Sequence, residues 1–245
     1  MGRATRIVVA IDAPGGDSSV ATGTCSAMAN PDPPREPVRL LVFAASLRED
    51  SVNSRLAALA AGIMETEGAV VDRAAMSDFD VPAYDGDLEH GAGPPAGAEA
   101  LRRRLLGTDA FVIASPEYNA SMPGVLKNLI DWVSRFRPQP WSGRHGLLMS
   151  ASPSMVGGNR GAWALRVPLE HLGSRIYPDM FSLARAHDAF SADGALADAR
   201  LQGRLESTLA GFIDLVEAAK HYPCIRREWV EFLGEQPEPA IDRVE

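Results

Sequence analysis

The feature that most constrains this chain is an alternation of short apolar runs with longer segments of helical periodicity, which begins at residue 38. Apolar runs of strand length occupy residues 38–44, 69–73, 109–114, 145–150 and, more weakly, 180–184. Apolar residues at helical spacing mark residues 52–67, 98–106, 123–133, 161–172 and 197–220. This alternation predicts an α/β fold in which helices cover both faces of a parallel sheet.

Composition excludes several other classes of protein. The chain has 245 residues, of which 46% are hydrophobic and 23% charged, so it is neither a disordered chain nor a fibre. Its two cysteines form no Cys-x-x-Cys or Cys/His cluster, and we expect no metal site. Subtracting 32 acidic from 24 basic residues leaves a net charge of −8, which argues against sequence-independent binding to nucleic acid.

The two ends differ from the alternating region. Residues 12–37 are rich in Gly, Ser, Thr, Asp and Pro, so we predict a disordered N-terminal arm over 1–37, with a strand at 7–11 as the alternative. The domain itself is expected over 38–220. Residues 221–245 form a C-terminal extension that either docks as a short helix or contacts a partner. No apolar run reaches the ~18 residues of a membrane span, and the run at 7–11 is too short for a signal peptide, so we expect a cytoplasmic protein.

The expected sheet also predicts where chemistry takes place. In open parallel sheets, ligands bind beyond the carboxyl ends of the strands. Three unusual segments follow the predicted strands there, and we name them loop 1 (residues 45–53), loop 2 (115–124) and loop 3 (150–159).

Loop 1 carries polar groups that suit a phosphate. Hydroxyls, one guanidinium and the free N–H groups at a helix start can together bind a dianion, and the side chains concerned are Ser46, Arg48, Ser51 and Asn53. The alternative is that Ser51 or Asn53 simply caps the helix while Arg48 is a solvated charge. The loop has neither the Gly-Lys-Ser/Thr ending of a Walker loop nor a Gly-x-Gly-x-x-Gly pattern.

Loops 2 and 3 suit a flat ligand. Loop 2 can present backbone amides and the ring of Tyr118 to a heteroaromatic group, although it could also be an ordinary strand–helix connection. In loop 3, Gly157 and Gly158 permit positive φ or close backbone approach, although the loop could instead be a flexible connector. Taken together, the three loops predict a mononucleotide site at one edge of the sheet.

Two motifs make the chain similar to a known family. Residues 46–53 read Ser-Leu-Arg-x-x-Ser-x-Asn, and residues 115–132 read Ser-Pro-Glu-Tyr-Asn-x-Ser-x-Pro-Gly-x-Leu-Lys-Asn-x-Ile-Asp-Trp. Over residues 38–220 the chain resembles the NADPH-dependent FMN reductases, a family that includes chromate and quinone reductases. The resemblance implies a flavodoxin-like three-layer sandwich whose five-stranded parallel sheet has the order 2-1-3-4-5.

The resemblance also implies the cofactor and its contacts. The FMN phosphate would be held by Ser46, Arg48, Ser51 and Asn53. The isoalloxazine ring would be lined, mostly through backbone groups, by Pro116, Glu117, Tyr118 and Asn119. The other edge would be closed by Ser152, Gly157 and Gly158. No side chain need be catalytic, because the flavin carries the chemistry, and backbone N–H groups near Tyr118 and Asn119 would stabilise the reduced ring.

The implied reaction is a ping-pong cycle. NADPH or NADH would donate hydride through FMN to a quinone, free flavin, azo dye or metal oxyanion. The resemblance implies a homodimer or homotetramer in which the helix over 123–132 packs near a subunit interface. The apolar residues of this helix cover more than one of its faces, which agrees with that expectation. We expect no metal, nucleic acid or membrane partner, and no catalytic role for His145 or His171.

Two other functions stay open at this point. One is an FMN-binding electron carrier, and the other is a flavodoxin-like scaffold with weak or lost FMN binding. The second is favoured by Ala45, which stands where the family usually has Gly, and by the carboxylates of Glu49 and Asp50 beside the expected phosphate. If the backbone at Ala45 needed a positive φ, alanine would cost about 1 kcal/mol or more. No Gly-x-Ser-x-Gly elbow is present, which argues against a hydrolase.

Overall fold

A computed structural model describes the backbone of residues 36–233 and the side chains of residues 36–220. The expected arm lies almost entirely outside the described residues, as does the alternative strand at 7–11. The side chains of the C-terminal extension lie outside them as well. The two domain boundaries, at 37 and 220, therefore stay predictions.

The sheet has the predicted order and direction. Its long strands are β1 (Arg39–Ala44), β2 (Val70–Ala75), β3 (Ala110–Ala114) and β4 (His145–Ala151). With the short strand β5 (Arg175–Ile176), the order is β2-β1-β3-β4-β5. Every pair of neighbouring strands is parallel. β1 from Leu40 onward and the whole of β3 are buried, as expected for strands with helices on both faces.

The edge of the sheet beside β4 differs from the sequence expectation, which is a single strand over 180–184. Two short strands share it: β5 (Arg175–Ile176) pairs with the start of β4, and β6 (Phe181–Leu183) pairs with its end. Pro178 lies between the two strands. Because proline has no backbone N–H to donate, it interrupts the ladder at this point.

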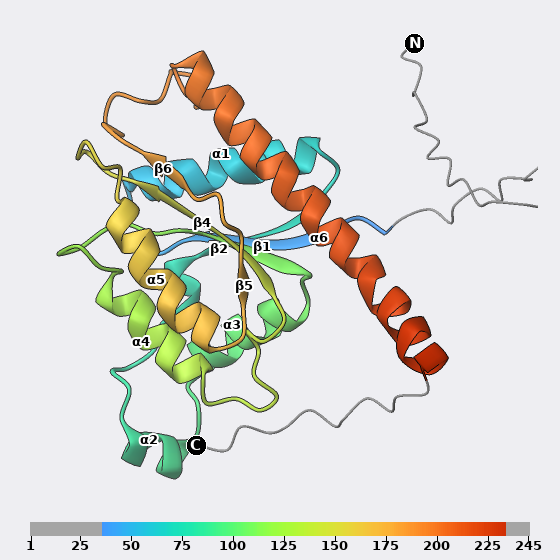
Figure 1. Cartoon of the computed structure of the whole chain (residues 1–245). Helices are drawn as coiled ribbons and strands as arrows, with labels where there is room; N and C mark the ends of the chain where they lie inside the picture. The colour runs from blue at the N-terminus through green and yellow to red at the C-terminus, as the bar shows by residue number, and fades with distance from the viewer. Residues whose placement is uncertain (1–35, 234–245) are drawn as a thin grey trace, which may run out of the picture. The chain divides into compact units, whose positions relative to one another are not determined.

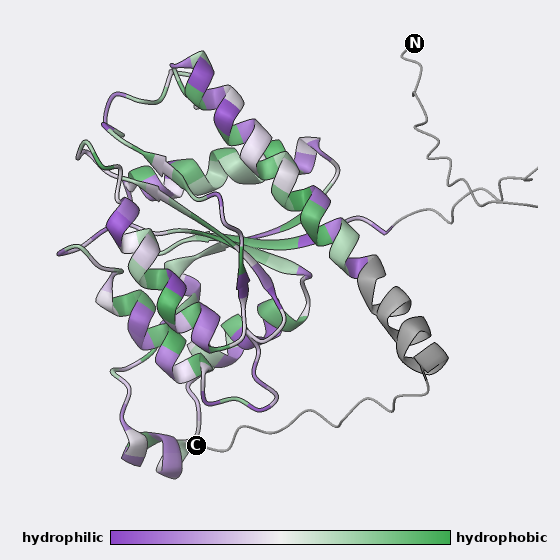
Figure 2. Ribbon diagram, viewed as in Figure 1, coloured by the Kyte–Doolittle hydropathy of each residue, from purple (hydrophilic) through white to green (hydrophobic). Residues whose placement is uncertain are grey.

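The helices form two layers (Figure 1). α1 (Val52–Thr66) and α6 (Ala199–Leu233) cover one face, and α3 (Ala96–Leu106), α4 (Gly124–Val133) and α5 (Asn159–His171) cover the other. Successive residues of β1 point to opposite faces, so Leu40 and Val42 join the α1/α6 core while Leu41 and Phe43 join the α3–α5 core. Figure 2 shows the resulting concentration of hydrophobic residues in the central strands.

Two helical segments differ from the sequence expectation. The Pro/Gly-rich composition of residues 77–97 predicts a loop, but the chain makes a 3-10 helix, η1 (Met76–Phe79), and α2 (Gly86–Ala92). No residue of α2 is buried, so it has no apolar periodicity that could reveal it. The helix expected to end at residue 220 continues as α6 to Leu233. Among the described helices, none is long and apolar enough to cross a membrane.

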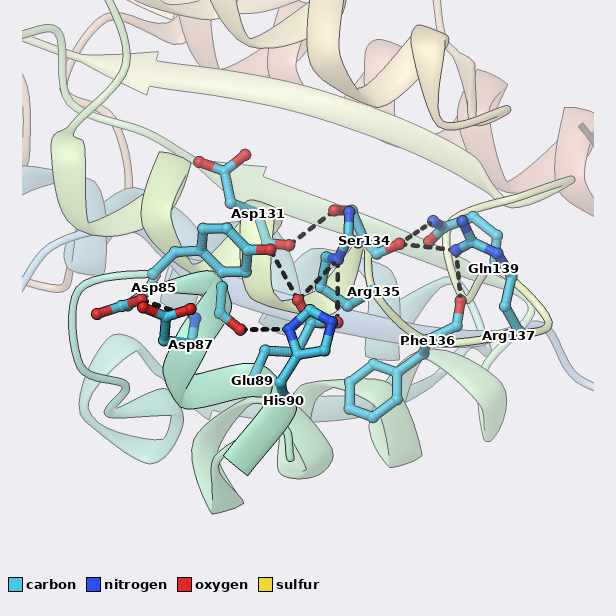
Figure 3. A network of polar contacts seen from close by, with 12 residues as sticks. Asp85, Asp87, Glu89, His90, Asp131, Ser134, Arg135, Phe136, Arg137 and Gln139 are labelled. Carbon is cyan, nitrogen blue, oxygen red and sulfur yellow. Dashed lines mark hydrogen bonds and ion pairs between the residues drawn. The ribbon is translucent and has the colours of Figure 1, made fainter. Parts of the chain in front are cut away.

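Polar contacts hold α2 in place (Figure 3). The Glu89 carboxylate accepts hydrogen bonds from the hydroxyl of Tyr84 at 2.7 Å and from Nε of Arg135 at 3.1 Å. The bond from Tyr84 holds the pKa of Glu89 below its usual value, although burial opposes this, and the bonds from Arg135 lower it further. The position of α2 therefore depends on a residue 46 positions away in the sequence.

Candidate functional site

The three loops meet at the carboxyl edge of the sheet, as the sequence predicts. Ala44 of β1 is in register with Ala114 of β3, which is in register with Met149 of β4. Just beyond the strands, the N–H of Ala45 donates to Ala114 at 2.9 Å and the N–H of Ser115 donates to Met149 at 2.8 Å. Loops 1, 2 and 3 therefore leave the sheet at the same level, from the neighbouring strands β1, β3 and β4.

Loop 1 ends in a capped helix. Ser51 is the N-cap of α1, and its hydroxyl accepts from the N–H of Ser54 at 3.4 Å, so the capping interpretation of Ser51 is correct. The N–H groups of Val52 and Asn53 have no recorded partner in the described part of the chain. These two donors, at the positive end of the helix dipole, are available to an anion.

The charged residues of loop 1 are exposed. Within residues 36–220, the Arg48 guanidinium has no hydrogen-bond or ion-pair partner, and only its backbone N–H is bonded, to Ser46 Oγ at 3.3 Å. Glu49 and Asp50 are exposed as well, so water screens their repulsion of an anion. The loop thus offers one unpaired cation beside a serine hydroxyl.

Ala45 does not have the strained backbone that would weaken loop 1. The non-glycine residues with positive φ in the described chain are Asn119, Ala120 and Arg185. Ala45 is fully buried in the α3–α5 core. Alanine at this position therefore carries no left-handed penalty, and this argument for a lost cofactor fails.

Asn53 has a structural role that the sequence did not reveal. Its side-chain amide donates to the carbonyl of Ala151, and its side-chain oxygen accepts from the N–H of Ala151, both at 2.9 Å. The residue is only 2% exposed. Asn53 thereby ties the start of α1 to the end of β4, and its contact with a phosphate stays a prediction.

Loop 2 contains a tight hairpin. The N–H of Tyr118 donates to Ser121 at 2.9 Å, and the N–H of Ser121 donates back to Tyr118 at 3.0 Å. Between them, Asn119 and Ala120 have φ values of 52° and 62°, the pattern of a type I′ turn. The hairpin uses the N–H of Tyr118 but leaves those of Asn119 and Ala120 without a partner among the described residues, so these two remain available to a ligand.

Glu117 connects loop 2 to the helix that follows loop 3. One carboxylate oxygen accepts from the backbone N–H groups of Arg160 at 3.0 Å and Gly161 at 3.2 Å, and the other accepts from the Arg160 guanidinium at 2.6 and 2.9 Å. Burial alone raises the pKa of Glu117, but the hydrogen bonds from Arg160 and Gly161 together hold it below its usual value. The ionised carboxylate therefore caps α5 at the positive end of its dipole.

Loop 3 packs closely against the end of the sheet. Gly157 and Gly158 have φ values of 61° and 81°, and a Cβ on Gly158 would lie 1.9 Å from Oγ of Ser150. The positive φ and the close backbone approach that these glycines permit are both present. The N–H of Ser152 donates to Leu183 of β6 at 3.1 Å, so this end of loop 3 is anchored and is not a free connector.

Sequence reasoning missed Arg160, Gly161 and Ala151. The spacing of Gly158 and Gly161 was a usable signal for the close approach, because a Cβ on Gly161 would lie 3.0 Å from Cα of Glu117. Nothing in the local sequence marks Ala151, which acts through its backbone. The described residues contain no cluster of three or more His, Cys, Asp or Glu side chains that could hold a metal ion.

The two histidines lie away from the three loops. His145 begins β4 at the amino end of the strand, and His171 ends α5. Burial lowers the pKa of His145, and the nearby charge of Arg175 lowers it further, so His145 is neutral near physiological pH.

Comparisons with known proteins agree with this geometry. The family model described as NADPH-dependent FMN reductase matches residues 38–188. The chain is 32% identical over 187 residues to a quinone reductase of Escherichia coli K12, covering 76% of this chain and 98% of that protein. It is 34% identical over 175 residues to the NAD(P)H-dependent FMN reductase PA1204 of Pseudomonas aeruginosa, covering 70% and 91% of the two chains.

A solved structure supports the same relationship. The chain superposes with a TM-score of 0.64 on FerB, a flavoenzyme NAD(P)H:acceptor oxidoreductase from Paracoccus denitrificans. The two are 28% identical, and the match covers 74% of this chain and 98% of FerB.

Proposed function

Because this chain belongs to the NADPH-dependent FMN reductase family, we propose that it is an FMN-dependent NAD(P)H oxidoreductase that reduces quinones. The observation that carries the proposal is the donor set of loop 1. Among the described residues, loop 1 and the first turn of α1 together carry an unpaired guanidinium, a serine hydroxyl and two free N–H groups at the carboxyl edge of the sheet. A phosphate monoester requires such donors, so the residues fit FMN.

The phosphate end of FMN would be held by loop 1. Arg48 supplies the charge-assisted hydrogen bond, Ser46 a hydroxyl, and Val52 and Asn53 their backbone N–H groups. Ser51 supports this arrangement as the N-cap of α1, and Asn53 supports it through its bonds to Ala151.

The ring end would lie between loops 2 and 3. Pro116, Glu117, Tyr118 and Asn119 would line it from loop 2, with Ser152, Gly157 and Gly158 opposite. The free N–H groups of Asn119 and Ala120 would stabilise negative charge on the ring, whereas the N–H of Tyr118 is already bonded within the hairpin. When bound, FMN supplies the two-electron chemistry, and the protein supplies orientation and electrostatics.

The overall reaction balances as NADPH plus a proton plus quinone giving NADP⁺ plus hydroquinone. We propose a ping-pong cycle in which NADP⁺ leaves before the acceptor is reduced. The name quinone reductase of the E. coli relative supports quinones as acceptors. Free flavins, azo dyes and metal oxyanions are further candidates to be tested as acceptors.

One experiment separates this function from its alternatives. The purified chain is titrated with FMN and then mixed anaerobically with NADPH in a stopped-flow instrument. Bleaching of the flavin band on the timescale of turnover supports the reductase. A bound flavin that NADPH does not bleach would indicate an electron carrier, and a chain that binds no FMN would indicate a scaffold.

The proposed assembly is a homodimer or homotetramer in the cytoplasm. The apolar side chains of α4 give little support to a subunit contact, because Leu126, Leu129, Ile130, Trp132 and Val133 are all buried within the protomer. Exposed apolar side chains on α5, Trp163 at 56% and Val167 at 69%, support a subunit contact instead. Light scattering coupled to size exclusion tests the mass.

A further inference from the structure

A pocket of about 290 Å³ lies beside loops 1 and 2, among residues that are not predicted flavin contacts. Loop 1 contributes Leu47, the segment after β2 contributes residues 76, 77 and 79–81, and α4 contributes Val125 in its first turn and Asn128. The complete lining is Leu47, Met76, Ser77, Phe79, Asp80, Val81, Val125 and Asn128.

The wall opposite loop 1 is held rigidly. The Asn128 side chain accepts from the N–H of Tyr84 and donates to the carbonyl of Pro82, both at 2.8 Å. Nε1 of Trp132 donates to the same carbonyl at 2.8 Å. A Cβ on Gly97 would lie 2.1 Å from the carbonyl oxygen of Asp80, so α3 begins directly against this segment. The pocket is therefore preformed.

The lining is apolar with one acidic group. Leu47 and Val125 are 62% and 41% exposed, so two large apolar side chains border the opening. Asp80 is the charged residue of the lining, and its carboxylate has no recorded partner within residues 36–220. The lining contains no cation. Such a pocket suits a flat neutral molecule and repels an anion.

We propose that this pocket binds the neutral quinone acceptor of the proposed function and that Asp80 disfavours anionic acceptors. The inference rests on the proposed function, because an acceptor here would lie next to the two loops that are proposed to hold FMN. The bound quinone gains the two electrons and one proton of a hydride that NADPH supplies, and it takes a second proton from solvent. It leaves as the hydroquinone. A metal oxyanion receives no comparable support from the lining.

The first test fills the pocket. Val125→Trp places an indole at the opening, and Leu215→Trp on α6 is the matched control, because Leu215 is 40% exposed on the other face of the sheet. With FMN-loaded protein, Val125→Trp should lower kcat/KM for 1,4-naphthoquinone by about tenfold or more, mainly through KM, while the control stays within about twofold. Unchanged quinone kinetics in Val125→Trp would overturn the proposal.

The second test concerns charge. Asp80→Asn should raise kcat/KM for ferricyanide, a trianion that accepts one electron per molecule, by about threefold or more while quinone kinetics stay within about twofold. An equal change for both acceptors, or no change for either, would contradict the role of Asp80 in selectivity.

FMN titration separates this inference from the proposed function. If Val125→Trp loses FMN while Leu215→Trp retains it, the pocket belongs to the cofactor and the acceptor assignment is wrong. If the unmodified chain binds no FMN, the proposed function fails. Calorimetric titration with 1,4-naphthoquinone then tests the pocket directly, since binding that Val125→Trp abolishes still supports it and an absence of binding refutes it.

Discussion

Asn53 and Ala151 exchange two hydrogen bonds of 2.9 Å across 98 positions of sequence. One residue lies in the first turn of α1 and the other at the end of β4. β3 lies between β1 and β4 in the sheet, so this side chain links the helix that follows β1 to a strand that is not a neighbour of β1. Loop 1 and loop 3 are therefore held at a defined separation before any ligand binds.

Replacing Asn53 with alanine should lower the free energy of unfolding by about 2–3 kcal/mol, because it leaves the N–H and carbonyl of Ala151 buried without partners. Urea denaturation of the FMN-free chain measures this. Ser54→Ala, one position along, is the control and should change stability by less than about 0.5 kcal/mol. Equal effects of the two substitutions would show that the paired bonds contribute nothing specific.

Glu117→Gln should destabilise the protein by about 2 kcal/mol near neutral pH, because the side chain is only 9% exposed and loses charge-assisted bonds. The pKa of Glu117 is lowered on folding, so its contribution is present above the unfolded pKa of about 4.3 and is lost as pH falls through the folded pKa. The difference in stability between wild type and Glu117→Gln should therefore shrink as pH falls below about 4.

Arg160→Ala provides the comparison for Glu117. The Arg160 side chain is 62% exposed, and its removal leaves the two backbone N–H bonds to Glu117 intact. Arg160→Ala should lower the free energy of unfolding by about 1 kcal/mol or less. Denaturation curves near neutral pH show which of the two variants loses more stability. A larger loss of stability in Arg160→Ala than in Glu117→Gln would mean that capping of α5 is not the main role of Glu117.

Arg48→Ala should weaken FMN binding by about one to two orders of magnitude, from the loss of about 1.5–3 kcal/mol. The stability of the FMN-free chain should hardly change, since the guanidinium has no partner in the described residues. Fluorescence titration with FMN gives the affinity. Arg103→Ala, an exposed arginine of α3, should leave the affinity unaltered. Unaltered affinity in Arg48→Ala would place the phosphate elsewhere.

Ala120→Gly and Ala45→Gly should change stability in opposite directions. Ala120 has a φ of 62°, so glycine relieves left-handed strain and should stabilise the hairpin by about 0.5–1 kcal/mol. Ala45 is buried and is not among the residues with positive φ, so glycine there should destabilise by about 1 kcal/mol. Thermal unfolding of both variants checks the signs, and a gain from Ala45→Gly would mean that its backbone is strained after all.

The strands of the sheet were predictable because their signals are local, whereas their order 2-1-3-4-5 was implied by the resemblance to the reductase family. The apolar runs that became β1, β3 and β4 are buried on both faces, and such burial requires an unbroken apolar sequence. α2 was not predictable, because it buries no residue and depends on the contact of Glu89 with Arg135. The splitting of the fifth strand into β5 and β6 follows from Pro178, a local signal that could have been used.

The sequence by itself determined the succession of strands and helices along the chain and identified the three loops, because hydrophobic periodicity and turn composition act over neighbouring residues. Only the tertiary structure decided what Asn53 and Glu117 do with their side chains. Their partners, Ala151 and Arg160, are 98 and 43 positions away, and they come within reach only through the packing of the sheet and its helices. A buried polar side chain takes whatever partner the fold places beside it, and that partner is not encoded in its neighbours.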